Sequence, residues 1–380
     1  MSRDQRRVII QIVLFLLTLI CTTIAGAEWT YGRSVFMPDY SWDDFYSGFH
    51  FSIPFLLILT VHEFGHFFMA KYHKVKVTLP YYIPMPPFQF SIGTMGAVIR
   101  LKSKVHSKKQ NFDIGLAGPL AGFVMALIVL FYGFTNLPEP EYIFQIHPEY
   151  EQYGLDYADY VYDSLPEGIL NVSLGKNLLF LFFEDFVGDP ARVPNPHEII
   201  HYPYLFAGFL SLVFTCLNLL PIGQLDGGHV VYGLFGFRTH KIIATIAFFL
   251  LLLYAGVGVI DLSKDPGDLT MWIGGSLVFL YMSLYALGLP QKDTLMYSLL
   301  ILAFMLVVGH VFPSAHGYSG WLLYIFILGR FIGIQYPPAE IEEPLDNKRI
   351  ILGWLTLLIF VITFSPAPIE IQEISPALRP

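Results

Sequence analysis

Charged residues are scarce in this sequence of 380 residues. Asp, Glu, Lys and Arg make up only 14% of the chain, whereas a typical soluble domain contains about 25%. So few charges cannot cover the surface of a soluble protein of this length, and the hydrophobic share of 54% agrees with that conclusion. The formal net charge of −8 gives no basis for binding nucleic acid. We therefore expect a polytopic membrane protein that contacts the lipid bilayer and no nucleic acid.

Cysteine is also scarce, with only Cys21 and Cys216 in the whole chain. Two cysteines exclude a disulfide scaffold, and because both lie inside apolar runs they do not indicate a redox compartment. Glycine shows no period, which excludes a collagen-like chain. The many Phe and Leu residues exclude a disordered one.

Long apolar runs, in contrast, are frequent. A helix needs about 20 mostly apolar residues to cross a bilayer, and nine runs qualify: 8–26, 51–70, 115–135, 203–221, 241–260, 270–289, 294–312, 320–334 and 350–365. The Pro-rich stretch 79–88 cannot form a regular helix, and the following residues 91–101 have the composition of a strand. We therefore expect an all-α polytopic membrane protein of about nine transmembrane helices, with a small re-entrant β element near residues 79–101.

The same patterns divide the chain into three parts. Residues 1–50 hold the first span and an outer loop, residues 51–240 form a core, and residues 241–380 supply additional C-terminal spans. We expect the core to contain the spans 51–70, 115–135 and 203–221, the inner β element 79–101 and the outer loop 136–202.

Charge placement predicts the topology. The segment 71–110 carries eight basic residues and no acidic one, whereas the loop 136–202 carries twelve acidic residues and only Lys176 and Arg192 as basic ones. Basic loops stay on the inner side of a membrane. We therefore expect the N-terminus and residues 71–114 inside, and the loop 136–202 and the C-terminus outside.

The second span contains the sequence His62-Glu63-Phe64-Gly65-His66. Residues four apart lie on one face of a helix, so His62 and His66 can bind one zinc ion together. The neighbouring Glu63 can accept a proton from a zinc-bound water. Three ionisable groups within five residues of a membrane span are costly unless they serve a site. We therefore expect a zinc site here.

Catalytic zinc usually has three protein ligands, and the best candidate for the third is Asp226. It follows the fourth span, where Pro221 and Gly223 interrupt the helix. We expect Asp226 to lie on unwound backbone at the inner end of that span. The charge pattern places this end on the same side of the membrane as His62 and His66.

A second HExxH pattern, His197 to His201, lies in the acidic outer loop. Pro196 and Pro203 on either side leave space for only one or two helical turns, and ionisable residues in water need no special explanation. We therefore expect residues 197–201 to be an ordinary part of the loop. Metal binding by His197 and His201, or capping of the fourth span, stays open.

Taken together, these residues resemble the site-2 protease family of intramembrane zinc metalloproteases, of the M50 type. HEFGH matches its HExxH, and the stretch from Asn218 to Asp226 matches its N-x-x-P and L-D-G signature. The resemblance covers about residues 50–240. It implies His62, His66 and Asp226 as zinc ligands, Glu63 as catalytic base and a role for Asn218 near the site.

One family element departs from its usual form. Gly118 and Pro119 match the first two residues of the family's G-P-x-x-N sequence, but Gly122 stands where the family has Asn. Many members also carry a PDZ domain between the core spans. The outer loop of 67 residues is short, acidic and Pro-rich, so we expect no PDZ domain here.

The resemblance implies an enzyme that hydrolyses peptide bonds in or near transmembrane segments of single-span membrane proteins, in regulated intramembrane proteolysis. A membrane metal transporter and an inactive scaffold of the same fold are the alternatives. Transporters usually show repeated halves, which are absent here, and every residue that hydrolysis needs is present. Only seven residues precede the first span, so we expect a prokaryotic plasma membrane rather than an organelle, with the N-terminus and the active site on the cytoplasmic side. The substrate and the oligomeric state stay open.

Overall fold

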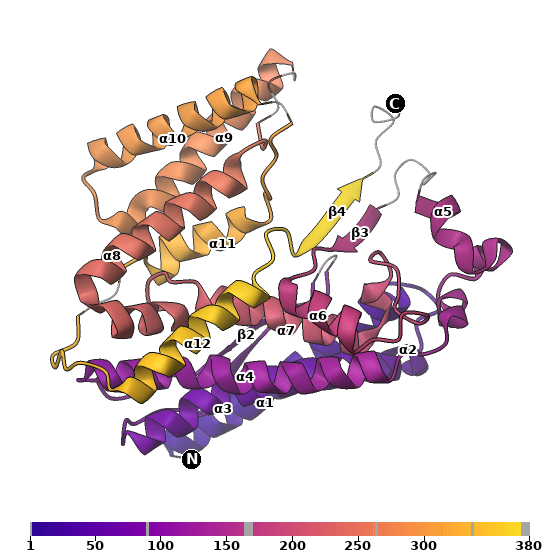
Figure 1. The fold of residues 1–380 in the computed structure, drawn as a ribbon, viewed down its shortest axis with the longest axis horizontal. Helices are drawn as coiled ribbons and strands as arrows, with labels where there is room; N and C mark the ends of the chain where they lie inside the picture. The colour runs from indigo at the N-terminus through magenta and orange to yellow at the C-terminus, as the bar shows by residue number, and fades with distance from the viewer. Residues whose placement is uncertain are drawn as a thin grey trace. The chain divides into compact units, whose positions relative to one another are not determined.

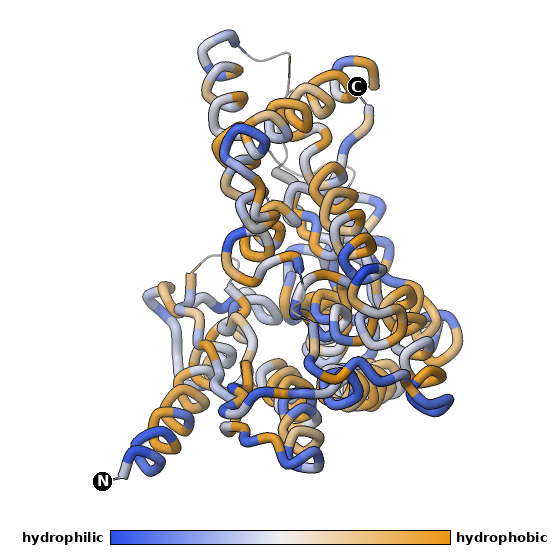
Figure 2. Tube along the Cα trace, turned by 90° about the vertical axis from the view of Figure 1, so that its left-hand side faces the viewer, coloured by the Kyte–Doolittle hydropathy of each residue, from blue (hydrophilic) through white to orange (hydrophobic). Residues whose placement is uncertain are grey.

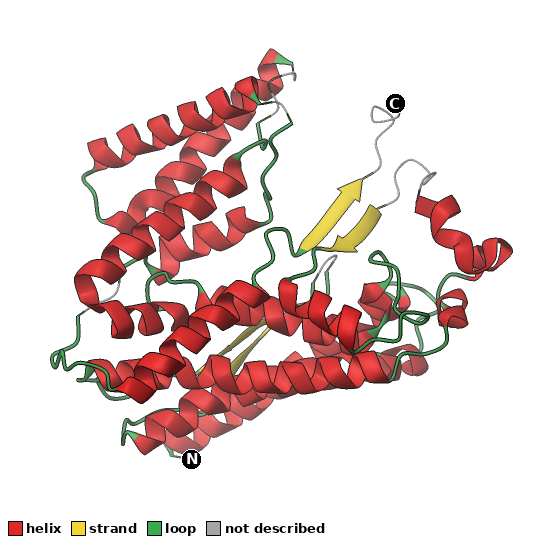
Figure 3. Ribbon diagram, in the orientation of Figure 1, coloured by secondary structure: helices red, strands yellow, loops and turns green. Residues whose placement is uncertain are grey.

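The structure is a computed structural model, and it describes residues 2–88, 91–162, 170–260, 262, 265–312, 314–335 and 338–373. These residues are mostly helical and include two small two-stranded sheets (Figure 3). The chain forms two compact units. The first contains residues 1–104, 117–217 and 358–380, and the second contains residues 105–116 and 218–357.

The first unit holds the N-terminal helices, the outer loop and both sheets. Its elements are α1 Arg3–Tyr31, α2 Trp42–Ser47, α3 Phe49–Tyr72, β1 Tyr81–Pro84, β2 Thr94–Val98, η1 Pro140–Gln145, η2 Pro148–Asp156, α5 Tyr157–Val161, β3 Leu170–Leu174, α6 Leu178–Phe186, η4 Ile199–His201 and β4 Ile369–Glu373. It also contains most of α4 (Lys108–Thr135), most of α7 (Pro203–Leu219) and the end of α12 (Asn347–Thr363).

Helix α1 begins at a capping box, in which Ser2 accepts from the backbone of Gln5 and the Gln5 side chain accepts from the Ser2 backbone. Its first turns are polar and the remainder is apolar, as the hydropathy colouring shows (Figure 2). Large apolar side chains such as Ile12 and Leu16 are about half exposed on this helix. An apolar surface of this kind is expected where a helix faces lipid.

Strands β1 and β2 form an antiparallel pair within the expected β element. The pair is held against α1, because Gln11 donates to the Leu79 carbonyl at 2.6 Å and Trp29 donates to the Ser91 carbonyl at 2.9 Å. Gly93 has a φ of +80°, and a Cβ at this position would meet the backbone of Thr22 at 2.4 Å. The strands are therefore present, whereas their entry into the bilayer stays a prediction. Residues 89–90 lie outside the described residues.

The core of the first unit is aromatic. Phe51 stacks on Phe55 and on Phe206, with ring centroids 5.3 and 5.2 Å apart. Phe180 packs edge-on against Phe134 from the outer loop side. All five rings are buried, and they join α3, α4, α6 and α7 into one apolar cluster.

The second unit is a helical cluster. Its elements are α8 Asp226–Gly256, α9 Pro266–Leu284, η5 Tyr285–Leu287, α10 Gln291–Val311, α11 Trp321–Ile327, the π-helix η6 Leu328–Ile332 and the start of α12. Helices α8 to α11 pack together (Figure 1). Helix α8 is bent at Gly236, whose φ of +78° and ψ of 173° are accessible only to glycine.

Two pairings within the units bear on the topology. Strand β4, near the C-terminus, pairs with β3 of the outer loop (Figure 1), so both segments lie on the same side of the membrane. Ser107 and Lys109 of the basic segment bind Glu343 at 2.5 and 3.3 Å, so the loop before α12 lies on the same side as that segment. Both relations agree with the alternation expected from the charge pattern.

The protein is an integral membrane protein, but the expected count of nine spans is not confirmed. Five helical segments of the described residues are long and apolar enough to cross a membrane: Arg3–Tyr31, Trp42–Tyr72, Lys108–Thr135, Asp226–Gly256 and Gln291–Val311. The fourth and eighth expected spans are the shorter apolar helices Pro203–Leu219 and Trp321–Ile332. The fifth expected span is only the second part of the long helix α8, because that helix already begins at Asp226.

Candidate metal centre

The HEFGH sequence lies on regular helix in the second half of α3. His62, Glu63 and His66 are 6%, 5% and 7% exposed, so three ionisable side chains are buried within about one turn. The Nε2 atoms of His62 and His66 are 3.1 Å apart. Two nitrogens that bind one tetrahedral zinc ion at about 2.0–2.1 Å lie about 3.3–3.4 Å apart. The two imidazoles therefore fit a zinc ion.

Helix α4 makes room for these rings with glycine. A Cβ on Gly118 would lie 2.1 Å from Nε2 of His66, and a Cβ on Gly122 would lie 3.0 Å from Cβ of His62. Gly65 of α3 likewise approaches the carbonyl of Ala117, which a Cβ would meet at 2.5 Å. Small residues let two membrane helices approach closely. The Gly at position 122, where the related family has Asn, therefore packs against a ring of the candidate centre.

The β element also reaches α3 close to the histidines. Tyr82 of β1 is buried, and its hydroxyl lies 2.7 Å from the hydroxyl of Thr60, which precedes His62 by two residues. Its ring also packs edge-on against Phe15 of α1 at 5.0 Å between centroids. The β element is thus fixed beside the helix that carries the candidate centre. The sequence gives no signal that marks Tyr82 for this contact.

The fourth expected span ends two residues before Pro221, which the sequence predicted to interrupt the helix. Helix α7 stops at Leu219, and Gly223 has a φ of +56° in the turn that follows. Asn218 is half-buried in the last turn of α7. The expectation for Asp226 is wrong in one respect: this residue is the first residue of α8 and not part of the unwound segment.

The Gly pair after Asp226 allows this turn to close. A Cβ on Gly227 would lie 1.9 Å from the carbonyl oxygen of Leu219, and a Cβ on Gly228 would lie 2.2 Å from that of Gly223. The first turn of α8 therefore packs directly on the turn backbone. This contact fixes the position of Asp226 at the start of α8.

Asp113 of α4 forms an ion pair within the second unit. It lies inside α4, in a two-pronged ion pair with Arg349 at 2.8 and 2.7 Å. An N-cap role for Asp113, which its position just before an apolar run predicts, is therefore wrong, because α4 already begins at Lys108.

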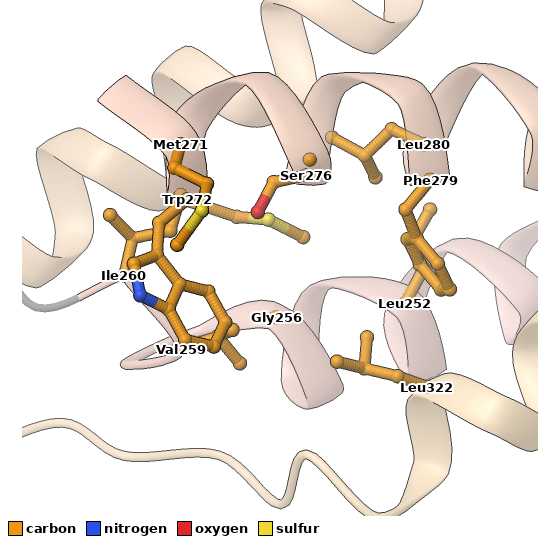
Figure 4. A pocket seen from close by; sticks show the side chains of 12 residues that line it. Leu252, Gly256, Val259, Ile260, Met271, Trp272, Ser276, Phe279, Leu280 and Leu322 are labelled. Atoms are coloured by element: carbon orange, nitrogen blue, oxygen red, sulfur yellow. The ribbon is translucent and has the colours of Figure 1, made fainter. Parts of the chain in front are cut away.

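One described cavity is apolar. It has a volume of about 330 Å³ and lies among α8, α9, α10 and α11, with Trp272, Phe279 and Leu322 among its lining residues (Figure 4). None of the side chains that line it is ionisable. This cavity therefore offers no group for acid, base or metal chemistry.

The second HExxH pattern is not on an α-helix. Only Ile199–His201 forms a 3₁₀ turn, η4, and His197 stacks on Tyr162 with ring centroids 4.2 Å apart. His201 is buried, and this burial lowers the pKa of its imidazole to about 4. The ring is therefore neutral at pH 7.

Comparison with known proteins identifies the class. Residues 50–254 match the family model described as Peptidase family M50. The match covers more than half of the chain and includes both HEFGH and Asp226, so the chain belongs to this family.

Curated relatives support the same assignment. A probable zinc metalloprotease EGY1, chloroplastic, of Oryza sativa subsp. japonica is 33% identical over 48% of this chain and 27% of its own length. The protein of the same name in Arabidopsis thaliana is 32% identical over 47% of this chain and 28% of its own. A probable zinc metallopeptidase EGY3, chloroplastic, of Arabidopsis thaliana is 27% identical over 63% of this chain and 38% of its own length. No solved structure matches the chain.

The chain thus spans little more than a quarter of the length of the EGY1 relatives. These relatives are named as chloroplastic, so the comparisons do not support the prokaryotic plasma membrane that the sequence led us to expect.

Proposed function

We propose that this protein is an intramembrane zinc metalloprotease that hydrolyses peptide bonds in or near transmembrane segments of other membrane proteins. The observation that carries this proposal is the buried pair of imidazoles on α3, with Nε2 atoms 3.1 Å apart and Glu63 beside them. Membership of Peptidase family M50 and the zinc metalloprotease names of the relatives support it.

His62, His66 and Asp226 are the proposed zinc ligands. Support for Asp226 comes from its L-D-G sequence and from its place at the start of α8, directly after the helix break. When bound, zinc lowers the pKa of water and polarises a carbonyl group.

Glu63 is the proposed general base. Its carboxylate accepts the proton of the attacking water and passes it to the leaving amine, a role that burial favours because it keeps competing water away. Asn218 is proposed to donate a hydrogen bond from its amide to the carbonyl oxygen of the scissile bond as negative charge develops there.

The proposed substrates are single-span membrane proteins, cleaved in regulated intramembrane proteolysis. A helical segment hides its peptide bonds and must be extended before hydrolysis. Among the residues that the structure describes, strand β2 pairs with β1 alone, and Met95 and Val98 of β2 are more than half exposed. An extended substrate segment can add to this sheet through main-chain hydrogen bonds. We place the site toward the side of the membrane that carries the basic segment 71–110.

Replacement of Glu63 by Gln tests the function. We expect cleavage of a tagged single-span substrate by the purified protein in detergent to fall at least ~100-fold, because the base is lost, while zinc stays bound. Glu141→Gln, an exposed change in η1, is the matched control and should leave cleavage unchanged.

The same preparation separates the alternatives. A chelator should stop cleavage by the wild-type protein, and added zinc should restore it. Zinc movement into vesicles without proteolysis would indicate a transporter, and neither activity would indicate a scaffold. Full cleavage by the Glu63→Gln variant would rule out the proposed base.

A further inference from the structure

A second cluster of metal-binding groups lies in the outer loop of the first unit. His147, Glu198 and His201 each offer a ligand atom, and these atoms lie within 4.8 Å of one another. His147 lies between η1 and η2, whereas Glu198 directly precedes the 3₁₀ turn η4 before α7 and His201 ends it. The cluster therefore joins two segments that are about fifty residues apart in the sequence.

The two imidazoles are already oriented as ligands. Nδ1 of His201 lies 3.0 Å from the carbonyl oxygen of Thr30, to which it donates its hydrogen, so that Nε2 keeps its lone pair. Nδ1 of His147 lies 3.1 Å from a carboxylate oxygen of Glu149. Metal-binding histidines usually have such a carbonyl or carboxylate partner on the other ring nitrogen.

Glu198 supplies a buried carboxylate that lacks a full set of partners. The residue is 2% exposed, and one of its oxygens accepts from the hydroxyl of Tyr162. The other oxygen, Oε2, is buried and has no hydrogen-bond partner among the described residues. A buried carboxylate oxygen without a partner is costly. A cation between Glu198 and the two imidazoles would remove this cost.

The distances suit a small divalent cation. The two Nε2 atoms are 3.2 Å apart, and Oε2 of Glu198 lies 3.9 Å from Nε2 of His147 and 3.6 Å from Nε2 of His201. The circle through three atoms with these separations has a radius of about 2.1 Å, which equals the usual zinc–nitrogen and zinc–oxygen distances. One ion at or just above the centre of this circle can therefore reach all three atoms.

We propose that His147, Glu198 and His201 form a second zinc site, distinct from the one on α3, which fastens the outer loop to the core of the first unit. Two imidazoles and one carboxylate are a common zinc-binding set, with a water completing the tetrahedron. The His147 side chain is 27% exposed, which leaves a path for the ion and space for that water. The ion would hold the η1–η2 segment against the turn before α7 and, through His201, against the end of α1.

Zinc content of the full-length protein tests this site. We expect two zinc ions per chain in the wild type, measured by elemental analysis after purification in detergent. His147→Ala and Glu198→Gln should each reduce this to one, and the double change His62→Ala, His66→Ala should also leave one. Combining His147→Ala with that double change should leave none.

His197→Ala is the matched control, because His197 belongs to the HExxH pattern but stacks on Tyr162 outside the cluster. It should keep two ions. Wild-type zinc content in both His147→Ala and Glu198→Gln would overturn the proposal. Glu198→Gln keeps the size of the side chain and a carbonyl oxygen that can accept from Tyr162. It therefore still tests the site if His147→Ala does not fold.

A second measurement separates this site from the proposed catalytic one. In the His62→Ala, His66→Ala background, a chelator should speed digestion of residues 136–202 by an added protease, because only the outer site still holds zinc. An unchanged digestion rate would overturn the fastening role. Loss of peptidase activity in the His62→Ala, His66→Ala variant tests only the catalytic site.

Discussion

Gly118 of α4 offers a direct test of the candidate centre, because its missing side chain leaves room for His66. In a Gly118→Ala variant the new Cβ would lie 2.1 Å from Nε2 of His66, whereas ordinary contact begins at 3.4 Å. The ring or the helix must therefore shift by about 1.3 Å, which is far more than the ~0.2 Å that zinc ligand distances tolerate. Withdrawing α4 instead would separate it from α3 where Gly65 meets Ala117.

We expect this shift to lower both zinc occupancy and proteolysis. A misplacement of ~1 Å at a catalytic group costs about 100-fold in rate, which corresponds to about 2.7 kcal/mol of activation free energy. The assay is cleavage of a tagged single-span substrate, together with zinc content per chain. Gly122→Ala should have a smaller effect, below ~10-fold, because its Cβ would lie 3.0 Å from the nearest atom of His62 and needs a shift of only a few tenths of an ångström.

Gly309→Ala in α10 is the control, since a Cβ there would have no atom within 4 Å. It should keep full activity and raise helix stability by up to about 1 kcal/mol. Wild-type zinc content and cleavage in a folded Gly118→Ala variant would refute the argument, because they would mean that His66 needs no space beside α4.

Two further predictions concern the second unit. Gly227→Ala should lower the free energy of unfolding by at least ~2 kcal/mol, because its Cβ would overlap the carbonyl oxygen of Leu219 at 1.9 Å. The control Gly267→Ala, whose Cβ would have no atom within 4 Å, should have little effect. The thermal midpoint in detergent measures the stability of both variants. Arg349→Ala should cost about 1–3 kcal/mol, because the largely buried Asp113 carboxylate loses two charged hydrogen bonds. A second change, Asp113→Asn, should add little to Arg349→Ala, and fully additive losses would contradict the pairing.

The sequence predicted those features that depend on local chemistry. Pro221 marked the end of α7, and the composition of residues 91–101 marked a strand that the structure has at Thr94–Val98. The spacing of His62 and His66 predicted two facing imidazoles, because an i, i+4 pair on a regular helix has little freedom. The side of the membrane on which each loop lies, which charge placement predicts from counts of residues, stays a prediction.

The remaining features depend on contacts between distant segments. Gly118 and Gly122 lie about fifty-five residues after the histidines that they accommodate, and no periodicity connects them. Asp113 lies just before the apolar run, a position typical of a helix cap, whereas the helix begins five residues earlier at Lys108. There Lys109 pairs with Glu343, and Asp113 itself pairs with Arg349. The polar first turn of α4 is thus stabilised by a loop more than two hundred residues away.

The two HExxH patterns show that the backbone conformation decides which residues of a motif lie on one face. On α3, with 3.6 residues per turn, residues i and i+4 share a face, so His62 and His66 meet. Before α7, two prolines confine the chain to a 3₁₀ turn, in which residues i and i+3 are eclipsed. There Glu198 and His201 share a face, with Oε2 and Nε2 3.6 Å apart, and His197 is turned away to Tyr162. The same five-residue pattern thus provides two imidazoles and a carboxylate on an α-helix. On a 3₁₀ turn it provides one imidazole and one carboxylate, and the third ligand must come from elsewhere, which is the position that His147 occupies.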